Sequence, residues 1–282
     1  VKKTVEYARS IEEEHDKCFR FTITTNGVLL NDENIEYINR EMSNAVLSID
    51  GRKEVNDDLR PTVNGKGSYD VIVPKFQKLI EGRGTKDYYL RGTFTRFHQD
   101  FAEDVKALAS IGRNISVEPV VGKEDDPYAL QEADLPALKA EYERLAEYLR
   151  DHPETNFFHF NVDLAQGPCV IKRLRGCGAG CEYVAITPEG DIYPCHQFVG
   201  NEDYKLGSLY DGTFDKELSG RFAGLNIYTR EECKDCWARF YCSGGCSASN
   251  LLVNGDIKKP HRVGCGLECA IALRAIAAGM AE

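Results

Sequence analysis

A chain of 282 residues, 42% of them hydrophobic, is long enough for one large or two moderate domains with a full core. Its formal net charge of −10 argues against nucleic acid as a partner, because binding nucleic acid needs a basic footprint. No apolar run is long enough to span a bilayer, and residues 1–6 do not form a signal peptide. We therefore expect a cytoplasmic protein with no membrane partner, in a compartment where stable disulfides are uncommon.

Helical and extended patterns alternate along residues 1–150. Aromatic and β-branched runs predict strands, and apolar residues three or four apart predict helices between them. The expected strands are 18–25, 45–50, 88–95 and 115–121. The expected helices are 5–17, one capped by Asn31 or Asp32, one from Ser68 through Ile80 that Pro74 would kink or delay, one from Asp100 to Gly112, and one from Asp134 to Arg150. This alternation predicts an α/β fold with a parallel sheet and helical crossovers.

Polar residues follow two of the expected strands, at Thr25 and Asn26 and from Ser48 to Asp50. The carboxyl ends of parallel strands meet at one edge of a sheet, where β/α barrels place their sites. Three or four strands cannot close a barrel, so the sheet is either small and open or the later part of a larger one. We favour the second alternative, because Val1 is not a methionine and begins inside an expected helix.

Nine of the eleven cysteines lie close together in the second half of the chain. They are Cys177, Cys181, Cys195, Cys233, Cys236, Cys242, Cys246, Cys265 and Cys269. In a cytoplasmic protein this density points to metal ligation. Nine thiolates are too many for one tetrahedral ion but enough for two four-thiolate iron–sulfur sites. A four-cysteine zinc knuckle in a non-enzymatic scaffold stays an alternative, although it leaves five of these cysteines unexplained.

The cysteine-rich region is expected to consist of loops, turns and short strands. Glycines at 176, 178, 180, 244, 245, 264 and 266 would let the backbone curl around a cluster. Residues 183–194 predict a hairpin, and residues 265–281 predict a closing helix. The chain then divides into residues 1–150, a connector at 151–176, and a domain at 177–282. Cys18 and Cys169 are expected to be a buried strand residue and a connector residue, without a role in the site.

The cysteine spacing carries a resemblance to a known family. The run Cys177-x12-Gly190-x4-Cys195, then Cys233-x2-Cys236-x5-Cys242-x3-Cys246, then Cys265, resembles the SPASM domain of radical S-adenosylmethionine (radical SAM) enzymes. The segments 23–27, 47–51 and 91–93 resemble later strands of that family's partial β/α barrel. The resemblance therefore implies the C-terminal part of a partial barrel, followed by a SPASM domain with a C-terminal helix.

The resemblance also implies cofactors and their ligands. It assigns two auxiliary 4Fe–4S clusters to the nine cysteines. The first would be held by Cys177, Cys181, Cys195 and Cys246, the second by Cys233, Cys236, Cys242 and Cys265, and Cys269 is a ninth candidate. Ser48, Asp50 and Arg91 resemble positions that contact the ribose or carboxylate of S-adenosylmethionine, and Thr25 and Asn26 do so more weakly. Their alternative role is structural, in a network at the sheet edge or in an ordinary turn.

One family motif is absent from the sequence. Cys-x3-Cys-x2-Cys, which holds the third 4Fe–4S cluster that cleaves S-adenosylmethionine, occurs nowhere in the chain. The resemblance implies that this motif lies upstream of Val1 in an intact enzyme, and that the chain alone is inactive. A degenerate homologue without radical chemistry is the alternative.

Within the family, the chain most resembles the maturases of small six-cysteine (SCIFF) peptides, through residues 176–207 and 264–269. This likeness implies an enzyme that joins a cysteine sulfur to a carbon of another residue, forming a thioether in a ribosomally made, cysteine-rich precursor peptide. The implied electron donor is a flavodoxin or ferredoxin. Sulfatase-type and dehydrogenase-subunit maturases are alternatives, and the sequence identifies no catalytic residue.

Overall fold

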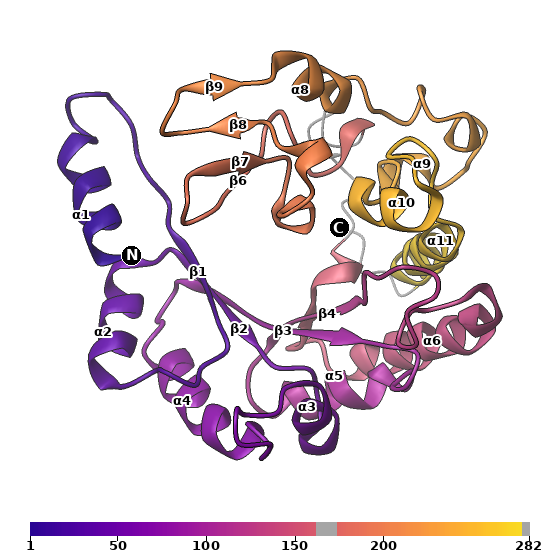
Figure 1. The fold of residues 1–282 in the computed structure, drawn as a ribbon. Coiled ribbons are helices and arrows are strands. Elements are labelled where there is room, and N and C mark those ends of the chain that lie inside the picture. The colour runs from indigo at the N-terminus through magenta and orange to yellow at the C-terminus, as the bar shows by residue number, and fades with distance from the viewer. Residues whose placement is uncertain (162–173, 278–282) are drawn as a thin grey trace. The chain divides into compact units, whose positions relative to one another are not determined.

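Five parallel strands form the main sheet of the computed structural model, which describes residues 1–161 and 174–277. Their order in the sheet is their order in the chain: β1 Thr22–Thr25, β2 Asn44–Ser48, β3 Asp87–Phe94, β4 Asn114–Pro119 and β5 Asn156–Phe157. The helices of this region are α1 Lys2–Ile11, α2 Asp32–Glu41, α3 Lys53–Leu59, α4 Tyr69–Glu81 and α5 Phe101–Ala109. Figure 1 shows α2, α3, α4 and α5 along one side of the sheet. The α/β fold with a parallel sheet is confirmed.

The sheet buries one face against these helices. Leu47, Leu90 and Ile115 are fully buried and occupy one register row across β2, β3 and β4. Further along β3, Phe94 stacks on Phe101 of α5 with ring centroids 4.5 Å apart. Each such side chain contributes roughly 1.5–3 kcal/mol when it leaves water. Because side chains alternate along a strand, the residues between these positions face the other side of the sheet.

Local signals explain the start of α2 but not that of α4. The Asn31 side chain accepts a hydrogen bond from the Asn34 N–H at 2.9 Å and caps α2, as expected. Ser68 does stand at the N-cap of α4, but its hydroxyl accepts a hydrogen bond from Asn56 and makes no cap bond. Pro74 neither delays nor ends α4, which begins at Tyr69.

Several sequence-based predictions differ from the structure. The first helix ends at Ile11 and β1 begins only at Thr22, so Cys18 is exposed and outside the strand. Neither α3 nor β5 is predicted from the sequence, because elements of seven and two residues carry too little periodicity. Cys169 lies outside the described residues.

The last helix expected in the first half of the chain is present, and the chain divides into two compact units. The helix expected at 134–150 is α6 Leu135–Asp151, which follows a 3-10 turn, η1 Glu132–Asp134, and its stripe of Leu138, Tyr142, Leu145 and Leu149 is buried. By contacts the chain forms two compact units: unit 1 is Val1–Pro119 with Glu147–His159, and unit 2 is Val120–Ala146 with Phe160–Glu282. The boundaries at 150 and 176, which rest on motifs, stay predictions.

Unit 2 contains short elements joined by turns. A four-stranded antiparallel sheet consists of β6 Ala185–Ile186, β7 Asp191–Tyr193, β8 Gly207–Ser208 and β9 Thr213–Phe214. Its helices include α8 Lys216–Ala223, α9 Arg239–Cys242, α10 Ser247–Asn254 and α11 Arg262–Ala277. Single 3-10 turns are η2 Phe158–Phe160, which begins in unit 1, η3 His196–Phe198, η4 Glu202–Tyr204 and η5 Glu231–Cys233. The predicted hairpin (β6–β7) and closing helix (α11) are confirmed.

The core of unit 2 is small and includes one of the candidate ligands. Phe198 packs edge-on against Phe222 at 5.4 Å, and Cys195 belongs to the same buried cluster. Within residues 1–161 and 174–277, no helix is both long and apolar enough to cross a bilayer.

Candidate cofactor and metal sites

Three polar side chains lie in one row on the sheet of unit 1. In the parallel register Ser48 of β2 pairs with Arg91 of β3, and Arg91 pairs with Ser116 of β4. They follow directly after the row of Leu47, Leu90 and Ile115, so they lie on the face turned away from the helices. Arg91 is exposed there. The sheet thus brings two of the predicted cofactor-binding residues, Ser48 and Arg91, side by side.

Asp50 is held by the protein itself. Its carboxylate is 3% exposed and accepts two hydrogen bonds from Arg60, at 2.5 and 3.0 Å. A third comes from the Thr93 N–H at 2.9 Å. Bidentate arginine–carboxylate pairing of this kind fixes geometry, so Asp50 ties the end of β2 to β3 and to the segment after α3.

Thr25 and Asn26 lie in a turn. Thr25 shares the register row of Leu47, which places it on the helix-facing side, unlike Ser48. The Thr25 hydroxyl accepts from the Gly27 N–H, and the Asn26 side chain accepts from the Val28 N–H. These contacts match the alternative of an ordinary turn.

Sequence reasoning missed a pair of residues beside Arg91. His159 Nε2 lies 2.7 Å from Glu118 Oε2, and the Ser116 hydroxyl donates to Glu118 Oε1 at 2.5 Å. Burial opposes ionisation of Glu118, but these hydrogen bonds and the charge of Arg91 outweigh it and lower its pKa to about 2. The alternation Ser116-x-Glu118 on a strand is the one sequence signal for it, because His159 is 41 residues away.

The first group of thiols gathers around Cys195. Cys195 is the N-cap residue of η3, and its side chain makes no cap hydrogen bond there. Burial raises the pKa of the Cys195 thiol, and the charges of Cys246 and Cys177 raise it further. Cys181 donates a hydrogen bond to the Gly178 carbonyl at 3.4 Å.

The second group gathers around Cys242 and Cys265. Burial raises the pKa of Cys242 to about 12, and Cys265 and Cys233 are among its charged neighbours. Burial also raises the pKa of Cys265 to about 11, with Cys233, Cys269 and Cys236 as neighbours. Cys269 and Cys236 share a hydrogen bond. The electrostatic neighbours link Cys195 with Cys177 and Cys246, and Cys242 with Cys233 and Cys265, whereas Cys181 is not among them. The ligand assignments stay predictions.

Backbone turns create the space beside these thiols. Ser243, Gly244 and Gly245 all have positive φ between Cys242 and Cys246, and the Gly244 N–H donates to the Cys242 sulfur. The expectation for Gly264 and Gly266 is wrong, because both are helical residues of α11. A Cβ at Gly266 would lie 2.9 Å from the Leu135 side chain, so this glycine serves helix packing.

The donor side chains of unit 2 can be compared with the ligands that a single metal ion or a cluster requires. Among residues 1–161 and 174–277, no three His, Cys, Asp or Glu side chains are arranged to hold one ion. The thiols instead form two looser groups, with the Gly244 N–H directed at Cys242 in the second. A 4Fe–4S cluster needs such soft donors, spread wider than around a single ion, and hydrogen bonds to sulfur. The residues present fit iron–sulfur clusters.

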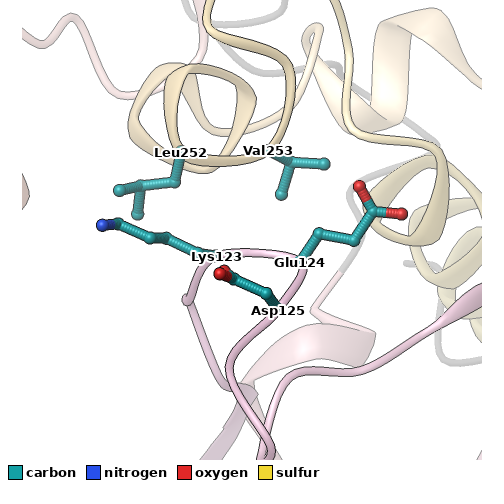
Figure 2. Close-up of a pocket in the computed structure, with 5 residues that line it drawn as sticks. All are labelled: Lys123, Glu124, Asp125, Leu252 and Val253. Carbon is teal, nitrogen blue, oxygen red and sulfur yellow. The ribbon is translucent and has the colours of Figure 1, made fainter.

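A surface hollow of about 520 Å³ lies elsewhere in unit 2. Figure 2 shows Lys123, Glu124 and Asp125 on a loop opposite Leu252 and Val253 of α10. Its five described lining residues include no cysteine, and their charges are mixed. It offers no converging polar groups, so we assign it no site.

Comparisons with known proteins agree with this chemistry. Residues 177–237 match the family model of the SPASM iron–sulfur cluster-binding domain. The chain is 25% identical over 250 residues to a cysteine-type anaerobic sulfatase-maturating enzyme of Clostridium novyi, covering 80% of this chain and 63% of that one. It is 28% identical over 225 residues to the mycofactocin maturase MftC of Mycolicibacterium smegmatis, covering 76% and 55%.

A solved structure shares the fold. The enzyme anSMEcpe, solved with bound AdoMet and a peptide, superimposes with a TM-score of 0.75 at 17% identity, covering 98% of this chain and 80% of that one. The chain spans about 55–63% of the length of the two curated relatives. The matched domain, the relatives and the shared fold together identify the chain as a homologue of the radical SAM maturases that carries a SPASM domain.

Proposed function

We propose that the chain is part of a radical SAM enzyme that forms cysteine sulfur-to-carbon thioether cross-links in a ribosomally made, cysteine-rich precursor peptide. The observation that carries the cluster part of this proposal is the gathering of thiols in two groups, around Cys195 and around Cys242 and Cys265. The maturase relatives and the peptide bound to anSMEcpe support a peptide substrate. The likeness of residues 176–207 and 264–269 to the SCIFF maturases is what favours the thioether-forming branch.

The cysteine side chains have one task in this proposal, which is to hold two clusters. The first auxiliary cluster would be held by Cys177, Cys181, Cys195 and Cys246, and the second by Cys233, Cys236, Cys242 and Cys265, with Cys269 next to the second. When bound, the clusters and S-adenosylmethionine supply one-electron transfer and radical formation. The buried thiols lose their protons on binding, and backbone N–H groups then stabilise the thiolates.

The sheet of unit 1 would hold S-adenosylmethionine. Arg91 is exposed on the polar face and suits a carboxylate, and Ser48 beside it suits a hydroxyl. The charge of Arg91 helps to lower the pKa of Glu118, so an ionised carboxylate lies near this arginine. Asp50 supports this edge through Arg60, and Thr25 and Asn26 shape the neighbouring turn. A flavodoxin or ferredoxin would supply the electrons.

The cluster content tests the first part of the proposal. After anaerobic reconstitution we expect about eight iron and eight acid-labile sulfide per chain, as two 4Fe–4S clusters require. Cys195→Ser should lose about half of both, whereas Cys18→Ser, which changes an exposed cysteine of unit 1, should lose neither. About one zinc and no sulfide would instead establish the zinc scaffold.

The reaction tests the second part. The full-length product of the gene, incubated with a six-cysteine precursor and S-adenosylmethionine, should remove two hydrogens for each thioether, detected by mass spectrometry. Cys195→Ser and Cys246→Ser should abolish cross-linking while cleavage of S-adenosylmethionine partly survives. Modification of a sulfatase-derived peptide instead would favour the sulfatase-type alternative, to which one relative belongs.

A further inference from the structure

Arg230 is a buried cation in the middle of the cysteine-rich unit. It is 3% exposed and stands at the N-cap of η5, three residues before Cys233. One terminal nitrogen donates to the carbonyls of Ile257 and Lys258, at 2.7 and 3.0 Å, and the other donates to the Ser247 hydroxyl at 3.2 Å. These bonds tie three segments of unit 2 together.

The Nε–H donor of Arg230 is not used by the part of the chain that the structure describes. Its Nε–H is buried and has no hydrogen-bond partner there. Within the same residues, no carboxylate comes within 4.0 Å of the guanidinium. A buried donor without a partner costs about 1–3 kcal/mol, and a buried charge without one costs more. Such a group indicates a partner of opposite charge that the polypeptide itself does not supply.

The unused N–H lies beside the cysteine turn. A Cβ at Gly244, whose φ is +89°, would lie 3.0 Å from Arg230 Nε, so this nitrogen sits against the backbone between Cys242 and Cys246. The charged neighbours that interact most strongly with the guanidinium are the sulfurs of Cys233 and Cys242, and Asp256 and Cys246 follow. Both leading thiols belong to the second group.

We propose that Arg230 is a positioning residue for the second cluster, to which its Nε–H donates a hydrogen bond at sulfur and whose negative charge its guanidinium offsets. This inference rests on the proposed function, since it needs a cluster at Cys233, Cys236, Cys242 and Cys265. One-electron reduction by dithionite adds one negative charge to the cluster. A nearby buried cation favours the reduced form, and hydrogen bonds to sulfur act in the same direction, so Arg230 raises the reduction potential.

A redox titration followed by electron paramagnetic resonance tests this inference on the anaerobically reconstituted chain. In Arg230→Gln, which removes the charge, we expect one of the two midpoint potentials to fall. The one-electron reduction equilibrium of that cluster should become about tenfold less favourable, a shift of about 59 mV. Arg230→Lys keeps the charge but lacks the Nε–H, and should show a smaller shift of the same cluster.

Arg83 provides a matched control. It is also 3% exposed and donates to backbone carbonyls, among them those of Met42, Ser43 and Asp87, but it lies in unit 1. Arg83→Gln should lower the melting temperature and leave both potentials unchanged. If Arg230→Gln does not bind clusters, Arg230→Lys provides the test. A midpoint potential lower than in wild type at one cluster of Arg230→Lys supports the inference.

The outcomes separate this inference from the proposed function. Wild-type protein without acid-labile sulfide overturns both. Wild-type protein with two clusters, whose potentials stay unchanged in Arg230→Gln and Arg230→Lys, overturns the role of Arg230 alone. So does an equal shift of both clusters, because the guanidinium interacts most strongly with Cys233 and Cys242 of the second group.

Discussion

The two units of this chain reach a folded state by different means. Unit 1 has strands of up to eight residues, and its buried rows of Leu, Ile and Phe side chains need no further partner. Unit 2 has strands of two or three residues, and several of its half-buried or buried groups are thiols or a lone arginine. Apolar packing dominates the first unit, whereas the second contains buried thiols and an Arg230 Nε–H that has no partner among the described residues.

The two units also differ in how their buried groups contribute to stability, because unit 2 buries thiols. The raised pKa values of Cys242 and Cys265, about 12 and about 11, mean that both are neutral near pH 7 without metal. Neutral thiols pack as small apolar groups, but they contribute less core than the Leu and Phe residues of unit 1. Metal ligation replaces their protons and adds bonds between distant turns. The stability of unit 2 should therefore depend on its clusters, and that of unit 1 should not.

Removal of iron should give the largest effect. In the chelated chain, we expect amide hydrogens of residues 177–277 to exchange at least a hundredfold faster, which requires a loss of only about 2.8 kcal/mol. Structural metal binding contributes on the order of 10 kcal/mol to folding, so its loss is large enough for this effect. The amides of β2, β3 and β4 should be unaffected. Hydrogen exchange with mass spectrometry measures both regions in one sample. Equal exchange of residues 177–277 with and without iron would contradict the contrast.

A glycine substitution should be next in size, and it acts on unit 1. Gly92 lies on β3 where a Cβ would meet the Ile49 carbonyl oxygen at 2.6 Å and Asp50 Cα at 2.9 Å. These are backbone atoms and cannot rotate away, so Gly92→Ala should lower the free energy of unfolding by about 3 kcal/mol. Gly220→Ala is the control, since nothing lies within 4 Å of that site in α8, and it should gain up to about 1 kcal/mol. Thermal melts of the reconstituted wild type and of both variants measure these changes in stability.

The sequence alone predicted those elements whose apolar residues repeat periodically or whose first turn is capped by a neighbouring side chain. The buried stripe of α6 and the Asn31 cap of α2 follow from residues close together in the chain. The cysteine groups came from a spacing motif, which no periodicity argument supplies. In contrast, α3 and β5 are too short to carry a repeat.

Other features depend on residues that are far apart in the sequence. Glu118 and His159 meet only because β4 and β5 are neighbours in the sheet. Gly266 is helical because Leu135 packs against it, which overrides the turn preference of glycine. Arg230 gave no sequence signal, since its partners Ser247 and Ile257 lie 17 and 27 residues away.

Glu118 allows a test of the polar face of unit 1 by pH. Its pKa falls from 4.5 to about 2 on folding, so below pH 4.5 the unfolded chain binds the proton first. The ionised carboxylate stabilises the fold above pH 4.5, and this contribution is lost as the pH falls toward 2. The shift corresponds to about 3 kcal/mol at most.

Glu118→Gln should therefore be less stable than wild type at pH 6, and this difference should shrink toward zero near pH 2. Urea unfolding at several pH values measures it. The control is Glu103→Gln, which removes an exposed ion pair with Lys106 and should cost less than about 1 kcal/mol at every pH. If the difference in unfolding free energy between Glu118→Gln and wild type did not vary with pH, ionisation of Glu118 in its pair with His159 would not contribute to stability.

The smallest effect compares one type of helix cap in both units. Asn31 caps α2 in unit 1, and Asp215 caps α8 in unit 2 by accepting from the Leu218 N–H at 2.8 Å. Replacing either residue by alanine should cost about 1 kcal/mol in the iron-loaded protein. After chelation Asn31→Ala should cost the same, because unit 1 still unfolds cooperatively. Asp215→Ala should then have almost no effect, because a cap contributes to measured stability only where its helix belongs to a folded unit. Urea unfolding of the two variants with and without iron, each compared with wild type in the same state, measures these costs. Exchange at the Leu218 amide is the local probe. An undiminished cost of Asp215→Ala without iron would mean that unit 2 holds its fold by packing alone.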